Sequence, residues 1–192
     1  MNLIQRKCVA LIHRIQRHYT KWEDRFQTDE LCRQFSKCGE GIYIYAPCRI
    51  TAPHKVKVGN NVHINRGAFI RANGGLLIGD NVHIGRNLVL YTVNHNYQGE
   101  ALPYDHTNIL KPVVINKNVW IGINVTIIPG ITIGEGAIIG AGTVVSKDVP
   151  PLAIVGASPQ QILKYRDKEH YRNLEQRQCY GGPSGVIFRR ES

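Results

Sequence analysis

Branched aliphatic residues recur at every sixth position through most of the stretch from residue 58 to residue 145. Two interruptions break this frame: two extra residues near Gly74 and Gly75, and a longer excursion after His95. A fixed short period predicts a repeat architecture, and a period of six predicts a parallel β-helix. The thirteen block starts are Val58, Ile64, Ile70, Ile78, Ile84, Leu90, Ile109, Ile115, Ile121, Ile127, Ile133, Ile139 and Val145.

The residue types within each block fit this geometry. A branched side chain packs well on a short strand, and the Gly, Asn or Asp that follows tolerates the backbone angles of a sharp corner. Segments 58–62 (VGNNV) and 78–82 (IGDNV) show this order clearly. Three strands would close one triangular coil of about eighteen residues, with the next coil stacked about 4.8 Å away. The sequence therefore predicts an all-β solenoid with the branched side chains pointing inward.

The repeat frame divides the chain into three parts. We expect a helical N-terminal cap over residues 1–42, a β-helix over 43–157 that carries a loop at 96–108, and a C-terminal helix and tail over 158–192. The C-terminal helix is predicted at about 160–177. Helical caps at both ends suit a solenoid, because an uncovered last coil is an exposed sheet edge.

The N-terminal cap is predicted to contain an amphipathic helix and a second helix from about Thr28 to Ser36. Charges interrupt every apolar run of the first helix, so it predicts neither a signal peptide nor a membrane span. Two placements are open for this helix. It packs on the triangular prism formed by the solenoid or on a neighbouring subunit, or it rests as a basic amphipathic helix on an anionic membrane surface. Its apolar face carries Ile4, Cys8, Leu11, Ile12 and Ile15, and its basic residues are Arg6, Lys7, Arg14, Arg17 and Lys21.

Composition narrows the compartment and the partners. At 192 residues and 43% hydrophobic, the chain is long enough for one continuous core. Its five cysteines are an odd number without a Cys-x-x-Cys pair, which indicates neither a disulfide framework nor a zinc knuckle and favours a reduced, cytoplasmic location. The formal charge of +10 fits phosphorylated small ligands, a membrane surface or nucleic acid. No motif of a nucleic-acid-binding fold accompanies it, so we expect no nucleic-acid partner.

The candidate chemistry lies where the repeat opens. His95 is the last residue of its block, and loop 96–108 follows directly. Loops that leave a rigid solenoid are where function concentrates, so this histidine is a candidate catalytic residue rather than a structural one. The loop also supplies polar side chains that could contact a ligand, namely Glu100, Tyr104, Asp105 and His106.

The motifs around His95 resemble those of the hexapeptide-repeat (left-handed β-helix) acyltransferases, most closely the sugar O-acetyltransferase branch. That branch holds the maltose, galactoside and nodulation-factor acetyltransferases. The resemblance runs from about residue 58 to residue 164, and it implies left-handed coiling, against the usual right-handed crossover. It is carried by 91–95 (YTVNH), 118–122 (NVWIG), 129–134 (PGITIG), 140–142 (GAG), 144–150 (VVSKDVP) and 155–159 (VGASP).

The resemblance also implies roles for single residues. His95 matches the family's general base, which takes the proton of the acceptor hydroxyl during attack on the thioester. Asn65 matches an acceptor-pocket residue, although it could instead be a corner residue in the left-handed conformation. Trp120 matches a residue of the same cleft, although it could instead pack at a subunit interface. Further substrate contacts are expected from Asn94, Tyr97 and Asp105.

The implied co-substrate is acetyl-CoA, bound between neighbouring subunits of a homotrimer, and no metal is expected. The two lysines of the implied channel would contact phosphates, or could be solvated surface charges. Relatives often carry Arg at the place of Gln161, so Lys164 or Lys168 would have to supply that contact. The implied cofactor-binding residues are Gly122, Ala141, Ser146, Lys147 and Lys164.

Three functions remain open at this point, and the first is preferred. It is transfer of acetyl to a hydroxyl of a saccharide acceptor, such as a surface polysaccharide or its precursor. The second is N-acetylation of an aminosugar, an antibiotic or an amino acid. The third is a non-catalytic scaffold or a zinc protein like the γ-class carbonic anhydrases, because His63 and His83 occupy one place in successive coils, about 5 Å apart.

Overall fold

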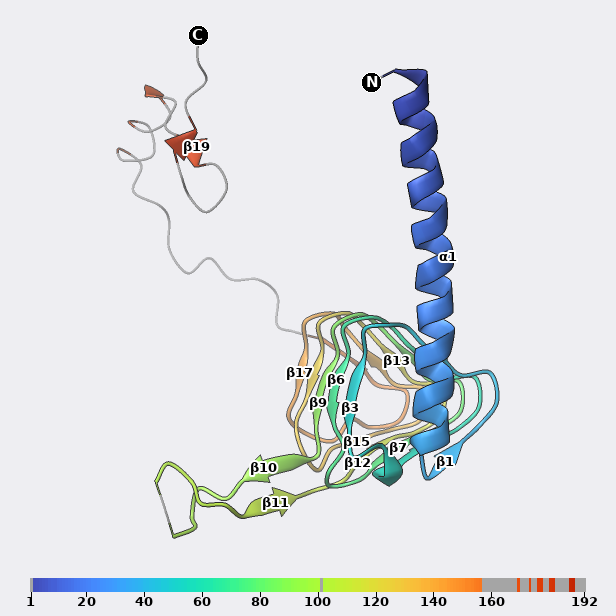
Figure 1. Cartoon of the computed structure of the whole chain (residues 1–192). Coiled ribbons are helices and arrows are strands. Elements are labelled where there is room, and N and C mark those ends of the chain that lie inside the picture. Colours follow the sequence, from blue (N-terminus) through green and yellow to red (C-terminus); the bar gives the residue numbers. More distant parts are fainter. Residues whose placement is uncertain are drawn as a thin grey trace. The chain divides into compact units, whose positions relative to one another are not determined.

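The computed structural model describes residues 2–100 and 102–156, and beyond them residues 169, 173, 176, 177, 180, 181, 187 and 188. The chain forms two units, Met1–Ala157 and Ser158–Ser192. In the first unit a long helix precedes a coiled solenoid, and a projecting hairpin interrupts the solenoid between β9 (Val89–Tyr91) and β12 (Val113–Ile115) (Figure 1).

The solenoid has three parallel sheets, called here sheets A, B and C, and the chain visits them in that order in every coil. Sheet A holds β1 (Lys37–Cys38), β4 (Val56–Val58), β7 (Leu76–Ile78), β12 (Val113–Ile115) and β15 (Thr132–Ile133). Sheet B holds β2 (Tyr43–Ile44), β5 (His63–Ile64), β8 (His83–Ile84), β13 (Trp120–Ile121), β16 (Ile138–Ile139) and β18 (Ile154–Val155). Sheet C holds β3 (Arg49–Thr51), β6 (Phe69–Arg71), β9 (Val89–Tyr91), β14 (Thr126–Ile127) and β17 (Val144–Val145), and a short 3-10 helix η1 (Pro53–Lys55) precedes β4.

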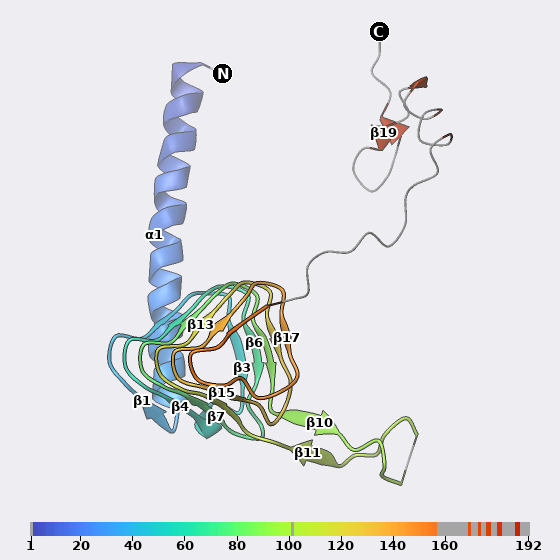
Figure 2. The same cartoon turned by 180° about the vertical axis from the view of Figure 1, so that it is seen from behind.

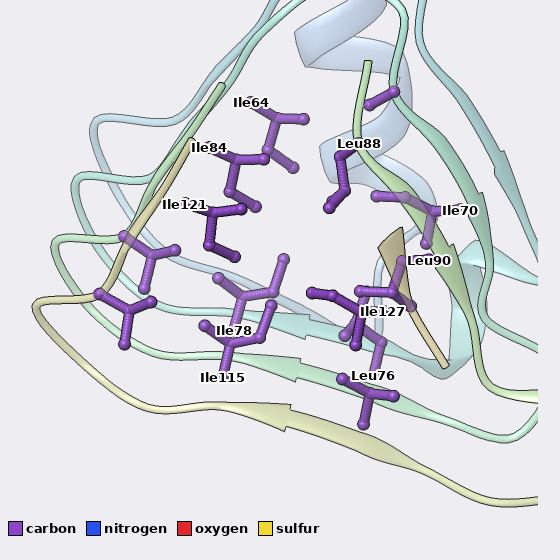
Figure 3. Close-up of a cluster of buried hydrophobic side chains, with 14 of the residues drawn as sticks. Ile64, Ile70, Leu76, Ile78, Ile84, Leu88, Leu90, Ile115, Ile121 and Ile127 are labelled. Carbon is purple, nitrogen blue, oxygen red and sulfur yellow. The ribbon is translucent and has the colours of Figure 1, made fainter. Parts of the chain in front are cut away.

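The core of the solenoid is formed by the branched residues of the predicted six-residue repeat. Every predicted block start is buried except Ile109, which is 38% exposed. Figure 3 shows the side chains of Ile64, Ile84 and Ile121 stacked from one side, facing Leu88 and Leu90 across the interior. The prediction of a left-handed parallel β-helix is thus confirmed.

Successive coils stay in register despite their different lengths. Ile64 pairs with Ile84, 20 residues later, and Ile84 pairs with Ile121, 37 residues later. Ile121 then pairs with Ile139, 18 residues later. The eighteen-residue coil therefore applies only after the excursion, and the earlier coils carry two extra residues.

The corners between sheets A and B are built by an asparagine ladder. Asn61, Asn81 and Asn118 adopt left-handed backbone angles, with φ of 52°, 56° and 61°. Their side chains form a chain of hydrogen bonds, in which Asn61 Nδ2 donates to Asn81 Oδ1 at 2.9 Å and Asn81 Nδ2 to Asn118 Oδ1 at 3.0 Å. Asparagine tolerates this conformation. The ladder also gives the side-chain amides hydrogen-bond partners in the neighbouring coil.

The corners between sheets B and C depend on close backbone approach. A Cβ atom on Gly85 would lie 2.6 Å from the carbonyl carbon of Gly122 in the next coil. A Cβ on Gly122 would in turn lie 2.7 Å from the backbone nitrogen of Ala141. Glycine is needed at these two places because real Cβ atoms do not approach backbone so closely.

Helix α1 (Leu3–Gln34) is a single continuous helix of 32 residues. Asn2 caps it, accepting a hydrogen bond from the backbone N–H of Gln5 at 2.9 Å in a capping box. The prediction of a separate helix from Thr28 to Ser36 is wrong. No Gly or Pro occurs between residues 3 and 34, so nothing in the sequence ends the first helix before Gln34.

The C-terminal part of α1 covers the first coil. Asp24 forms an ion pair with Arg66 (Oδ2 to Nη2, 2.7 Å) and accepts a hydrogen bond from the backbone N–H of Ala46 at 2.8 Å. Thr28 Oγ1 accepts from the backbone N–H of Ile44 at 2.9 Å. Leu31 completes the cover as a buried member of the core. These contacts confirm that a helix closes this end of the solenoid.

The first coil begins at Lys37, before the predicted boundary at residue 42. Cys38 in this coil forms a disulfide with Cys32 at the end of α1, so the interpretation that the cysteines indicate no disulfide is wrong. An odd number of cysteines does not exclude one bonded pair. Two of the other cysteines, the exposed Cys8 and the buried Cys48, are free thiols. Burial raises the pKa of the Cys48 thiol to about 12.

The excursion after the third coil is an antiparallel hairpin rather than a loop alone. Strand β10 (Val93–His95) pairs with β11 (Asn108–Leu110), and His95 lies opposite Asn108. The hairpin leaves the corner between sheets C and A and projects from the solenoid (Figures 1 and 2). Ile109 therefore belongs to a two-stranded ribbon with no core to face, which explains why this block start is exposed.

Most of the predicted C-terminal helix over 160–177 lies outside the described residues, together with Gln161, Lys164 and Lys168. Of the residues described there, Glu169, Asn173 and Gln176 are helical. Strand β19 (Tyr180–Gly181) pairs antiparallel with β20 (Ile187–Phe188). Within the described part of the chain, no helix combines the length and the apolar character needed to cross a bilayer.

Candidate active site

His95 is the outermost residue of strand β10 and is exposed. Its ring stacks on that of Tyr104, with centroids 4.0 Å apart and planes inclined by 8°. Its backbone N–H donates to the side-chain oxygen of Asn94 at 3.0 Å. The hairpin thus holds the imidazole against one flat partner, which limits its rotation while the ring remains open to a second molecule. The sequence did not identify Tyr104 as the stacking partner.

The tip of the hairpin is held by Asp105. Its Oδ1 accepts from the backbone N–H of Thr107 at 2.9 Å and from the Thr107 hydroxyl at 2.5 Å, and its Oδ2 accepts from the backbone N–H of Glu100 at 3.2 Å. The hydrogen bonds to Thr107, with smaller effects of Glu100 and of the charge of His106, lower the pKa of Asp105. In this structure Asp105 organises the loop that carries Tyr97, which is exposed and makes no contact with His95 among those described.

The root of the hairpin is fixed by Thr92, a residue that sequence reasoning passed over. It is fully buried, and its hydroxyl donates to the carbonyl of Arg71 at 2.8 Å and accepts from the backbone N–H of Gly74 at 2.7 Å. A Cβ on Gly74 would lie 2.1 Å from the Thr92 carbonyl oxygen. The backbone of Gly74 therefore packs directly against the point where the hairpin leaves the solenoid.

Asn65, Gly122 and Ala141 all lie at the corner between sheets B and C. Asn65 does not adopt the left-handed conformation of the corner asparagines, so that alternative is wrong. Its Nδ2 donates to the carbonyl of Ile84 in the next coil at 3.2 Å. Gly122 and Ala141 touch across successive coils, and together they form a smooth strip at this corner.

Trp120 lies on the outer face of sheet B, 60% exposed and paired in register with His83. The rings of His83 and His63 stack with centroids 4.3 Å apart, and Tyr43 meets His63 edge-on at 5.0 Å. Burial, and then the charge of His83, lower the pKa of His63. The predicted spacing of the two histidines is thus confirmed. No third ligand accompanies them, because the described residues contain no group of three His, Cys, Asp or Glu side chains that could hold a metal ion.

Ser146 and Lys147 follow strand β17 at the corner between sheets C and A, and both are exposed. This is the corner from which the hairpin leaves, two coils earlier in the stack. The exposed Val144 on the outer face of sheet C precedes them. The outer face of sheet C, with Val144, thus lies between Gly122 and Ala141 at one corner and Lys147 at the other.

One chain does not bring all the predicted site residues together. In a triangular prism each corner lies opposite one sheet, so the hairpin with His95 leaves on the side away from sheet B and Trp120. The views in Figures 1 and 2 agree, since strand β13 and the hairpin lie on different sides of the coils. His95, Asn94 and Asp105 form one group on the hairpin, and Asn65, Gly122 and Ala141 form another at the corner between sheets B and C. Ser146 and Lys147 lie at the hairpin's corner, two coils further along the stack.

This architecture defines the class of the protein. The profile of the bacterial transferase hexapeptide family (six repeats) matches residues 112–147. A hexapeptide-repeat acetyltransferase of Vibrio cholerae, solved with acetyl-CoA, is 31% identical with a TM-score of 0.61, over 71% of this chain and 75% of that one. The chain belongs to the hexapeptide-repeat transferase family.

Two further proteins indicate the range of its relatives. A maltose O-acetyltransferase of Clostridium difficile 630 is 28% identical with a TM-score of 0.56, over 79% of this chain and 87% of that one. A candidate acetyltransferase of Dictyostelium discoideum is 30% identical over 115 residues, 58% of this chain. The match spans only 57% of the Dictyostelium protein.

Proposed function

We propose that the protein is an acyltransferase that moves acetyl from acetyl-CoA to a hydroxyl of a saccharide, such as a surface polysaccharide or its precursor. The observation that carries the proposal is the position of His95, stacked on Tyr104 at the open end of a hairpin whose base is locked into the solenoid. The similarity to the Vibrio acetyltransferase solved with acetyl-CoA supports the co-substrate, and that to the maltose enzyme supports the acceptor.

In this mechanism His95 acts as a general base. Its unprotonated ring nitrogen takes the proton of the acceptor hydroxyl as the oxygen attacks the thioester carbonyl. The tetrahedral intermediate then expels the thiolate, which takes the proton back from the imidazolium. The products are an acetate ester and free CoA. Such a base contributes on the order of 10²- to 10⁴-fold to the rate.

We further propose that each site forms between two copies in a homotrimer. The hairpin leaves one corner of the prism, while Asn65, Gly122 and Ala141 lie at another. A hairpin that reaches the second corner of a neighbour would unite the two groups. The thioester arm of acetyl-CoA would then lie along Gly122 and Ala141, whose lack of bulk leaves room for it, and Ser146 and Lys147 would meet its polar parts. Trp120 would border the acceptor.

The first test measures CoA release from acetyl-CoA with a panel of sugars, nucleotide sugars, serine and aminoglycosides. His95→Ala should reduce kcat/KM on the best acceptor by about 10²-fold or more. The matched control is His106→Ala, an exposed histidine on the same hairpin, which should stay within a few-fold. Equal rates for His95→Ala and wild type would exclude the proposed base, and turnover of amines alone would replace the saccharide with an amine acceptor.

A second experiment tests the shared site. His95→Ala removes the base, and Ala141→Arg, at an exposed residue, should block the strip at the other corner. Each variant alone should be inactive. Co-expression should restore part of the activity, because in a mixed trimer a normal hairpin can meet a normal corner. An inactive mixture that still assembles into mixed trimers would show that both residues act within one chain.

A further inference from the structure

Between residues 4 and 26, α1 carries an apolar stripe that stays exposed within the described part of the chain. Its large side chains are between 52% and 73% exposed. The interval of eleven residues recurs from Ile4 to Ile15 to Phe26, and from Leu11 to Trp22. An eleven-residue period is close to three full helical turns, so the stripe runs almost straight along the helix. Its members are Ile4, Leu11, Ile12, Ile15, Tyr19, Trp22 and Phe26.

The stripe faces away from the solenoid. Asp24, Thr28 and Leu31 form the side of α1 that contacts the first coil. At 3.6 residues per turn, these positions lie roughly opposite the centre of the stripe on the helix circumference. A flat surface could therefore meet the stripe along its length without meeting the prism, and Figure 1 shows the helix extending well beyond the coils.

The charge of this segment is of one sign. Residues 2–22 contain five Lys and Arg residues and no Asp or Glu, and the first acidic residue of the chain is Glu23. Arg6 and Arg17 lie on the side away from the stripe, and Lys7 and Arg14 lie along one of its edges. Basic residues on the polar face and Trp, Phe and Leu on the apolar face are typical of helices that lie in a membrane interface.

The same charge disfavours a second copy of this helix as the occupant. Neither edge of the stripe carries acidic residues before Glu23, so two such helices would bring like charges together without compensation. An anionic bilayer, in contrast, complements the basic residues and accepts the apolar ones. The stacked rings of Trp22 and Phe26, 5.6 Å apart, with Tyr19 at 6.2 Å from Trp22, add side chains that favour the headgroup region.

We propose that α1 docks the protein on an anionic lipid bilayer, with the stripe from Ile4 to Phe26 immersed in the interface and the solenoid held on the opposite side of the helix. This docking does not rest on the proposed acetyl transfer. It uses residues that lie on α1 and not on the hairpin or the corners of the prism.

The test is co-sedimentation of the full chain with phosphatidylcholine vesicles, with and without phosphatidylserine. Binding should require the anionic lipid and weaken at high salt. Leu11→Ser with Ile15→Ser, and separately Arg14→Glu with Arg17→Glu, should each reduce binding by on the order of tenfold or more. The matched controls are Leu102→Ser, at a 95% exposed residue of the hairpin, and Lys57→Glu on the exposed face of sheet A, and both should bind like wild type.

Two readouts keep a folding defect apart from a docking defect. The melting temperature of each variant should match that of the wild type, since all the changed side chains are exposed. Tryptophan emission should shift to the blue on binding, and Trp22→Phe but not Trp120→Phe should abolish the shift. Vesicle binding that survives both double variants would overturn the proposal. So would stripe variants that change only the sedimentation mass of the free protein, which would assign the stripe to a second copy.

Discussion

The solenoid and the hairpin of this protein are built on opposite principles. In the solenoid every coil buries its branched side chains against the coils on either side, so no strand is stable alone. The hairpin buries almost nothing, and its order comes from the strand pair and from the hydrogen bonds of Asp105 at its tip. Thr92 at the root joins the two. The difference shows how a fold of great regularity can present a candidate catalytic side chain, namely by placing it where the regularity ends.

The largest difference in stability between the solenoid and the hairpin is expected when one isoleucine side chain is removed from each. Ile121→Ala removes a fully buried side chain and should lower the free energy of unfolding by about 2–5 kcal/mol. Ile109→Ala in the hairpin should cost within about 0.5 kcal/mol. Urea denaturation of both variants measures the contrast. A larger loss at Ile109 that grows with protein concentration would sharpen the comparison, because it would show that the hairpin is buried only against a second copy, as in the proposed trimer.

A smaller difference is expected for an added methyl group at a corner. Gly85→Ala places a Cβ 2.6 Å from the backbone of Gly122 and should cost about 1–3 kcal/mol. Gly156→Ala is the control, because no atom lies within 4 Å of its added Cβ. Thermal unfolding of the two variants tests whether coil stacking, rather than glycine content, sets the stability. Equal melting temperatures for Gly85→Ala and Gly156→Ala would mean that the backbone at the corner shifts to accommodate the methyl group at no cost.

The smallest effect concerns pH and should be confined to the hairpin. The fold lowers the pKa of Asp105 below its ordinary value of 3.8, so the folded tip favours the carboxylate. Its hydrogen bonds should be fully present above that ordinary pKa and be lost as the pH falls through the lower, folded value. The amide NMR resonances of Thr107 and Glu100 would report this loss. In Asp105→Asn these resonances should no longer change over the same pH range. A parallel loss of global stability at the same pH would contradict a purely local role.

The sequence was a good guide wherever one side chain decided the structure. The period of branched residues predicted the core and failed only at Ile109, where an antiparallel ribbon happens to continue the spacing. The predicted β-helix over 43–157 left out strand β1, because Cys38, which pairs with Val58, does not read there as a branched aliphatic residue. The sequence also predicted a separate helix from Thr28 to Ser36, although no Gly or Pro interrupts residues 3–34.

The sequence named candidate site residues but could not give their arrangement. The motif 91–95 drew attention to His95, and the turn that follows indicated a functional loop. The stacking of Tyr104 on His95 could not be foreseen, because it depends on how the hairpin tip folds back. That His95 and Trp120 lie on different sides of one prism follows from which corner the hairpin leaves, and only the strand order reveals this.

The register of the coils has a consequence for how such a protein can change. Ile84 pairs with Ile121 as closely as Ile64 pairs with Ile84, although nearly twice as much chain lies between them. Each coil thus returns to the same sheet one strand spacing further along the stack, and extra chain at a corner does not change the pairing of the strands on either side. A loop that leaves a corner can therefore be lengthened, shortened or exchanged over generations without a change in the packing of the interior.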